Sequence, residues 1–207
     1  MPSTFDAVAS RAIGDAVREL EARSAVELVV EVRARSGSYA HADARFAAAL
    51  ALLSLAGILF MPWVVPPIAV ILDPIAFYFL GTVLAPRSRG LRRLFTTRGE
   101  RFAAVRTHAH AAFHERGIGN TAAETGVLLY LSLLERRIEV VADRGLLRRV
   151  DASDWNTAIA ELHRSQALSP DAVIAAIRTL GAILARDVPA GDDNADELTN
   201  APEMQLA

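Results

Sequence analysis

The hydrophobic positions of this chain recur with the period of a helix in some segments and of a strand in others. These segments lie on either side of a central stretch that shows neither period. Over residues 4–22 apolar residues recur at helical spacing, which predicts an amphipathic helix. In the run SAVELVVEVRA that follows, valine and leucine alternate with Glu27 and Glu31. This alternation predicts a half-buried strand with the two glutamates on its second face.

The second half of the chain predicts further helices and strands. Residues 99–116 have the pattern of a helix that is closed by Gly117. The runs TGVLLYLSL and RRIEVVADRG are rich in β-formers and only a few residues apart, so they predict a β-hairpin. Two more helices are expected after it, the first capped by Ser153 and the second by Ser169.

Neither of these flanking parts is expected to fold alone, because one helix and one strand, or one hairpin, leave apolar faces uncovered. We therefore expect residues 4–40 and 99–189 to form one domain together. The predicted fold class is an α/β sandwich, a mixed sheet covered by helices. Residues 190–207 are polar, acidic and aperiodic, and are expected to be a disordered tail.

The central residues 46–86 carry one formal charge, that of Asp73. They divide at MPWVVPP into Phe46–Phe60 and Ile68–Ala85, each close to the ~20 residues that cross a bilayer. Proline suits the turn between two such helices and the start of the second. The alternative is a buried helical hairpin of a soluble protein, but such helices usually have a polar stripe. The pattern favours a transmembrane helical hairpin.

Arginines flank the hairpin on both sides, whereas its tip is uncharged. Arg87, Arg89, Arg92 and Arg93 follow the second span directly. By the positive-inside rule, we expect a multi-pass protein of the plasma (inner) membrane with both termini in the cytoplasm. The same arginines are suited to anionic lipid headgroups. A nucleic-acid partner is not expected, since the net charge is −2 and the arginine cluster has no interleaved aromatic residues.

Asp73 has two interpretations. An ionisable residue within a span is by default a functional candidate, such as an ion relay or an interhelical bond. Asp73 also lies only a turn or two after Pro67 and directly before Pro74, so it is equally placed to be hydrated near the tip or to cap a helix break. With one acidic residue and no partner in the other span, the sequence favours the structural interpretation.

The segment FHERGIGNTAAETGVLLYLSLLERRIEVVADRGL, residues 113–146, resembles the TPM-domain family. The likeness includes a helix with an aromatic residue, a glycine-containing loop, GVL at the start of a strand, a charged turn, a second strand and a closing loop. It implies an α/β sandwich interrupted here by the membrane hairpin. Some plant members of the family are weak acid phosphatases, and others are accessory or assembly factors. This chain departs from many members in the closing loop, where ADRG leaves only Asp143 and Gly145 as markers.

One candidate site is a group of oxygen ligands around that loop. Asp143, Asp151 and Asp154, with Asn120 from the preceding loop, are of the type that binds Ca²⁺ or Mg²⁺. The alternative is structural, because acidic residues also favour turns and helix N-termini. The chain has no cysteine, so disulfides, thiolate metal sites and cysteine nucleophiles are excluded.

His110 and His114 have the spacing of two zinc ligands on one helical turn. The glutamate of an HExxH motif is missing, and His108 is on another side of the helix. The sequence therefore favours solvated or membrane-proximal histidines.

Two functions of different classes follow from these observations. The first is a non-catalytic accessory, assembly or regulatory module, anchored in the bilayer and bound to a membrane-protein partner. The second is a divalent-metal-dependent phosphatase that uses the Asp143 loop, with Ca²⁺ or Mg²⁺ as its cofactor.

Overall fold

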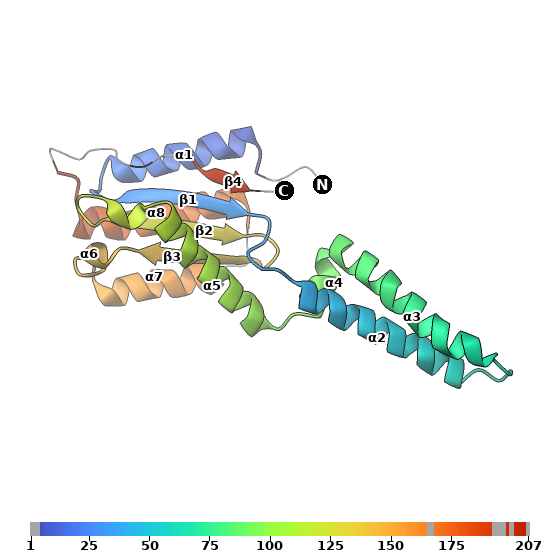
Figure 1. The fold of residues 1–207 in the computed structure, drawn as a ribbon. Coiled ribbons are helices and arrows are strands. Elements are labelled where there is room, and N and C mark those ends of the chain that lie inside the picture. The colour runs from blue at the N-terminus through green and yellow to red at the C-terminus, as the bar shows by residue number, and fades with distance from the viewer. Residues whose placement is uncertain (1–4, 165–167, 192–197, 199–200, 206–207) are drawn as a thin grey trace. The chain divides into compact units, whose positions relative to one another are not determined.

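A computed structural model describes residues 5–164, 168–191, 198 and 201–205 of the 207. The chain divides into two compact units, one made of residues 1–36 and 102–207 and the other of residues 37–101. The first unit contains a four-stranded mixed sheet in the order β3-β2-β1-β4. Figure 1 labels its elements: α1 (Ala7–Glu21), β1 (Glu27–Arg33), α5 (Arg98–Glu115, whose first turn belongs to the second unit), β2 (Gly126–Ser132), β3 (Arg137–Ala142), α6 (Arg144–Leu147), α7 (Ala152–Arg164), α8 (Pro170–Asp187) and β4 (Glu203–Gln205).

The sheet combines strands from the parts of the chain before and after residues 37–101. β1 pairs with β2 in parallel, from Glu27 opposite Gly126 to Arg33 opposite Ser132. β2 and β3 form the antiparallel hairpin that the sequence predicts. Because the two central strands come from either side of residues 37–101, the expected joint domain of residues 4–40 and 99–189 has a common sheet.

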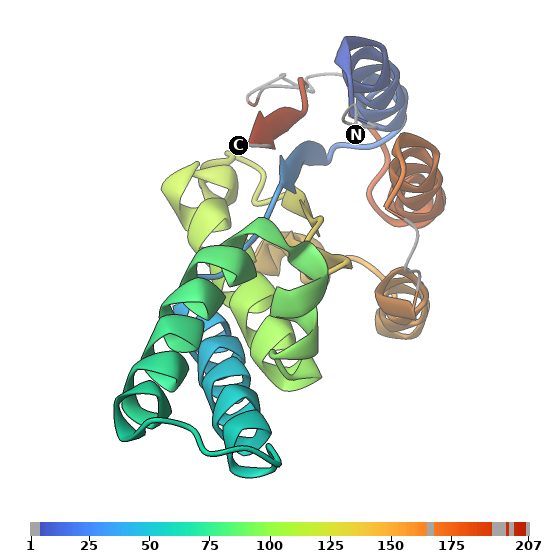
Figure 2. The same cartoon turned by 90° about the vertical axis from the view of Figure 1, so that its right-hand side faces the viewer.

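Helices cover both faces of this sheet, as Figure 2 shows. One face packs against α1, α7 and α8 through a core that includes Val17, Leu129 and Leu180. The other packs against α5 through Ala109, Phe113 and neighbours. The predicted class, a mixed sheet covered by helices, is confirmed.

The glutamate face of β1 is not open to solvent, which corrects the expectation of a half-buried strand. Glu31 is completely buried, and its carboxylate accepts hydrogen bonds from Arg33 Nε at 2.5 Å and Arg116 Nε at 2.8 Å. Arg116 directly follows α5, the helix that covers this face. A buried carboxylate is tolerated there because two guanidinium groups compensate its charge.

The expected disordered tail also needs a correction. Glu203–Gln205 form β4, which pairs in parallel with Glu31–Arg33 at the outer edge of β1. Residues 192–197, 199–200 and 206–207 of the tail lie outside the described residues.

Two predicted helix caps had different outcomes. Ser169 does cap α8, with its Oγ accepting from Ala172 N at 3.2 Å. Ser153 does not cap α7, because the Asp151 carboxylate accepts from the amides of Ser153 and Asp154 at 2.9 and 3.0 Å. The helix begins one residue earlier than Ser153, so Asp151 occupies the position where a side-chain acceptor is needed.

The second unit is a helical hairpin with a short helix after it. Its elements are α2 (Ala40–Leu59), α3 (Pro67–Leu84) and α4 (Arg89–Leu94). Candidate spans of 20 and 21 residues, Ala40–Leu59 and Pro67–Arg87, are long and apolar enough to cross a membrane. The first helix starts at Ala40 rather than at residue 46 and so includes Asp43 and Arg45.

The two long helices touch through small and polar side chains. A Cβ on Gly81 would lie 2.5 Å from Cα of Ala47, so the backbones approach closely at this point. Ser54 Oγ donates a hydrogen bond of 2.5 Å to Asp73 Oδ2. Asp73 therefore has a partner in the other helix, a serine, where the sequence indicated none.

Candidate functional site

A pocket of about 550 Å³ opens in the first unit where α5 and the end of β3 meet. It contains two of the four predicted metal ligands, Asn120 and Asp143, and both histidines of the predicted pair. Its lining consists of His110, Phe113, His114, Gly117, Gly119, Asn120, Val141, Ala142, Asp143 and Arg144.

The loop between α5 and β2 brings Asn120 to this pocket. Gly117 has a φ of 64°, in the left-handed region, and so ends α5 at low steric cost. A Cβ on Gly119 would lie 3.0 Å from Phe113 Cε1 and 3.4 Å from Asp143 Oδ2. The absence of a side chain at Gly119 therefore lets the Phe113 ring pack closely against the loop, while Asp143 lies at ordinary contact distance.

Asp143 ends β3 and begins the next helix. Its Oδ1 accepts a hydrogen bond from Gly145 N at 3.3 Å, which makes it the N-cap of α6. Its backbone amide donates to Gly126 O at 2.9 Å, which holds the loop against the start of β2. The structural role predicted for Asp143 is thus present, and the same side chain lines the pocket.

Asp151 and Asp154 do not line the pocket. Asp151 caps α7, and Asp154 forms an ion pair with Arg186 at 2.7 Å. Within the described ranges there is no group of three or more His, Asp or Glu side chains placed to hold a metal ion. The structure brings together Asn120 and Asp143 but places the other two aspartates at the N-terminus of α7.

Two of the three histidines of α5 line the pocket and the third does not, as their spacing along the helix predicts. His110 and His114 are exposed and line the pocket, while His108 does not and approaches Ala104 O with its Nδ1 at 2.9 Å. The His114 ring lies edge-on to Phe113, with centroids 5.7 Å apart. The pocket can thus offer a carboxylate, an amide and two imidazoles to a ligand.

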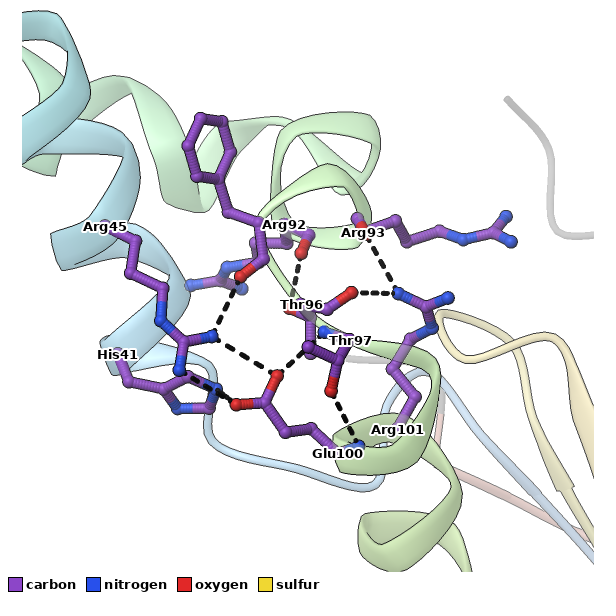
Figure 3. Close-up of polar contacts among 9 residues, drawn as sticks. His41, Arg45, Arg92, Arg93, Thr96, Thr97, Glu100 and Arg101 are labelled. Carbon is purple, nitrogen blue, oxygen red and sulfur yellow. Dashed lines mark hydrogen bonds and ion pairs between the residues drawn. The ribbon is translucent and has the colours of Figure 1, made fainter.

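The second candidate region is the group of arginines in the second unit. Arg45 forms two hydrogen bonds with the Glu100 carboxylate, at 2.9 and 3.2 Å, and Glu100 also accepts from Thr97 N (Figure 3). The hydrogen bond with Arg45 lowers the pKa of Glu100 to about 2. Arg45 is thereby fixed by an internal carboxylate.

Other arginines of this region also have partners within the protein, either a carboxylate or backbone carbonyl oxygens, which the sequence did not reveal. Arg92 forms a bidentate pair with Asp43, at 2.7 and 2.9 Å. Arg101 donates to the carbonyl oxygens of Arg93 and Thr96 (Figure 3). Arg87 donates to Val83 O, and the side chain of Arg89 lies outside the described part of the chain.

Sequence reasoning missed a buried polar group on the sheet. Glu135, in the turn between β2 and β3, is buried and accepts from Ser36 N at 3.0 Å and from Ser132 Oγ. Ser36 Oγ in turn bonds Ser132 at 2.6 Å and lies 2.9 Å from the Tyr130 hydroxyl. The signal available in the sequence was Ser132, a small polar residue at the end of an apolar strand.

The chain is similar in fold to a solved structure. The solved structure of BA42, a protein of the psychrophilic bacterium Bizionia argentinensis, is similar to this chain with a TM-score of 0.58. The two are 18% identical, and the match covers 96% of this chain and 94% of BA42. No protein-family model and no curated protein matches the chain. The likeness at this identity concerns the fold alone.

Proposed function

We propose that this chain is a TPM-like, membrane-anchored accessory module. Its α2–α3 hairpin crosses the plasma (inner) membrane, and its α/β domain assists or regulates a membrane protein from the cytoplasmic side. The observation that carries the proposal is the parallel pairing of β1 with β2, since the hairpin lies between them in sequence. Both ends of the hairpin must return to one side of the bilayer for this sheet to form.

The surface of the hairpin supports a lipid environment. Only 17% and 11% of the two candidate spans is buried within the protein. Large apolar side chains are therefore left exposed along both helices and the tip, among them Leu52, Leu53, Phe60, Val64, Ile71 and Phe79. A soluble protein rarely exposes a continuous apolar surface of this kind, whereas a bilayer requires it.

The polar contacts of the hairpin support the same placement. Asp73 is held by Ser54, which satisfies part of its hydrogen-bonding capacity within the helix pair. The arginines after α3 supply the positive charge that orients the hairpin. The helix pair is thus consistent with two spans whose charged ends are cytoplasmic.

The absence of cysteine from the chain gives a direct test of topology. We would introduce Val64→Cys at the tip, or Arg148→Cys in the α/β domain, and label intact cells with a membrane-impermeant maleimide. The tip variant should be labelled in intact cells and the domain variant only after lysis. Labelling of both variants in intact cells, or extraction of the protein from membranes by alkaline carbonate, would contradict the proposal.

The accessory role requires a defined partner. Purification of the full chain from native membranes in mild detergent should recover one membrane protein in a fixed ratio. The control is the same chain with Leu53→Arg in the apolar surface, which should not enter the membrane and should not recover the partner. Recovery of the full chain without a reproducible companion would count against the role.

A second candidate, a divalent-metal-dependent phosphatase, is favoured by the pocket that unites Asn120 and Asp143. Their two oxygens fit part of a Ca²⁺ or Mg²⁺ shell, with water in the remaining positions. This candidate predicts a rise in melting temperature with either ion and metal-dependent hydrolysis of an aryl phosphate, both lost in Asp143→Asn. Asp154→Asn is the matched control, because Asp154 pairs with Arg186 outside the pocket.

A further inference from the structure

The outer edge of β1 is closed by a very short strand. β4 pairs with it over only three residues, Glu203–Gln205, although β1 is seven residues long. One further backbone bond, from Ala34 N to Gln205 O at 2.8 Å, continues the pairing. Among the described residues β4 covers less than half of β1, and in the remaining part Leu28 N donates to Glu21 Oε1 at 3.0 Å. The part of the edge that suits an extended chain is therefore the part that β4 covers.

Side chains on both faces of β4 fix its register. Glu203 forms an ion pair with Arg116, and Arg116 also binds the buried Glu31 opposite it. Met204 lies opposite Val32 and packs against the core on the other face. An acidic residue followed by an apolar one is therefore what this edge recognises.

A pocket of about 370 Å³ extends the recognition site towards the N-terminal side of β4. Val29 and Ile118 form its apolar floor, and Arg116 and Glu203 form its polar end. Leu198 and residues 201–203 of the tail line the same pocket. Leu198 packs against the core of this face, and its backbone amide donates to Glu27 Oε2 at 3.2 Å. The tail thus contacts an apolar surface, Arg116 and a strand-pairing edge.

We propose that this edge is a peptide-binding site, which the C-terminal tail occupies in place of a partner. The ligand is an extended segment of a partner protein in which an apolar residue is followed by an acidic and a second apolar residue. It adds to β1 as a parallel strand after β4 has left, a mode in which main-chain bonds give affinity and side-chain pockets give specificity. The acidic residue is recognised by Arg116, which pairs with both Glu203 and Glu31 in this structure.

A partner segment that carries an acidic residue in place of Glu203 can replace the tail on this edge. When β4 leaves, Arg116 keeps its bond to Glu31, so the domain side of the site stays intact. A tethered tail competes at a high effective concentration, and so only a partner held nearby displaces it. This inference rests on the proposed accessory function for its partner, but the edge itself can be tested without one.

The test uses the full-length protein in detergent and a fluorescent peptide with the sequence LTNAPEMQ, residues 198–205. Gln205→Pro frees the edge, because the Gln205 carbonyl bonds Ala34 N, so the Gln205 N–H also faces β1 and proline would remove it. The peptide should bind this variant at least about tenfold more tightly than it binds the unaltered chain, where the tail competes. A peptide with glutamine in place of its glutamate should lose most of this affinity.

Three results would overturn the proposal: equal peptide affinity for the two proteins, equal affinity of the two peptides, or a stable dimer of Gln205→Pro that excludes the peptide. The last would assign the edge to a second copy of the chain. The topology labelling described above is independent of these measurements, so failure of the peptide site and failure of the membrane placement are distinguishable.

Discussion

Gly81 of α3 lies against Ala47 of α2 so closely that a Cβ at position 81 would come within 2.5 Å of the Ala47 Cα. Gly81→Ala should therefore force the helices apart at this crossing. We expect a loss of about 1–3 kcal/mol, typical of overpacking, seen as a lower melting temperature in detergent. Gly57→Ala is the control, because nothing lies within 4 Å of a Cβ there. Equal effects of the two substitutions would contradict this packing.

The bond between Ser54 and Asp73 should be measurable by a double-mutant cycle with Ser54→Ala and Asp73→Ala. Hydrogen bonds between helices in a bilayer contribute about 0.6–2 kcal/mol, so we expect a coupling free energy in this range. The measurement is reversible unfolding of the detergent-solubilised protein. Strictly additive effects of the two substitutions would show that the residues do not interact.

Acid should detach β4 from the sheet. The bond to Arg116 lowers the pKa of Glu203 from 4.5 to about 2. A carboxylate with a depressed folded-state pKa stabilises the attached state above its unfolded pKa, and this contribution is lost as the pH falls from about 4.5 towards 2. The methyl signal of Met204 in NMR spectra should report the change, and in Glu203→Gln the acid-dependent change should be absent.

The pair between Arg92 and Asp43 should contribute more than that between Arg45 and Glu100. Both are bidentate, but the side chains of Arg92 and Asp43 are only 14% and 13% exposed. Asp43→Asn should cost about 1.5–3 kcal/mol, as expected for hydrogen bonds to a charged group away from solvent. Glu100→Gln, measured in the same denaturant titration, should cost less, because solvent screens the more exposed pair.

Asp151 should act in stability and not in metal binding. Removal of its cap in Asp151→Ala should destabilise the α/β domain by about 0.5–2 kcal/mol. Ser153→Ala is the matched control and should have little effect, since Asp151 supplies the acceptor. Thermal unfolding with and without Mg²⁺ measures both properties at once, and a metal response that depends on Asp151 would contradict this assignment.

The elements with strong periodicity could be predicted from the sequence. The apolar runs of β2 and β3 and the uncharged run of α3 are local signals, and their ends lie within a few residues of the expected ones. The cap of α7 was harder to predict, because Asp151 and Ser153 are both good hydrogen-bond acceptors two residues apart. Only the residue at which α7 begins distinguishes them.

The candidate site depended on contacts that no local pattern contains. Glu31 and Arg116 are far apart in sequence, and their ion pair exists only because α5 covers the second face of β1. Strand β4 is three residues without a hydrophobic run, so its pairing follows from the edge that receives it. In the same way, Asn120 and Asp143 meet in a pocket whereas Asp151 and Asp154, nearer to Asp143 in sequence, do not.

The insertion of the hairpin between β1 and β2 also sets an order of events during synthesis. The ribosome delivers β1 first, yet its central neighbour emerges only after both apolar helices have been made. Until then the edge of β1 that later pairs with β2 has unpaired backbone groups. Through this edge the nascent chain can aggregate or recruit a chaperone. Completion of the sheet is therefore a late step of synthesis, because it waits until both helices of the hairpin have been made.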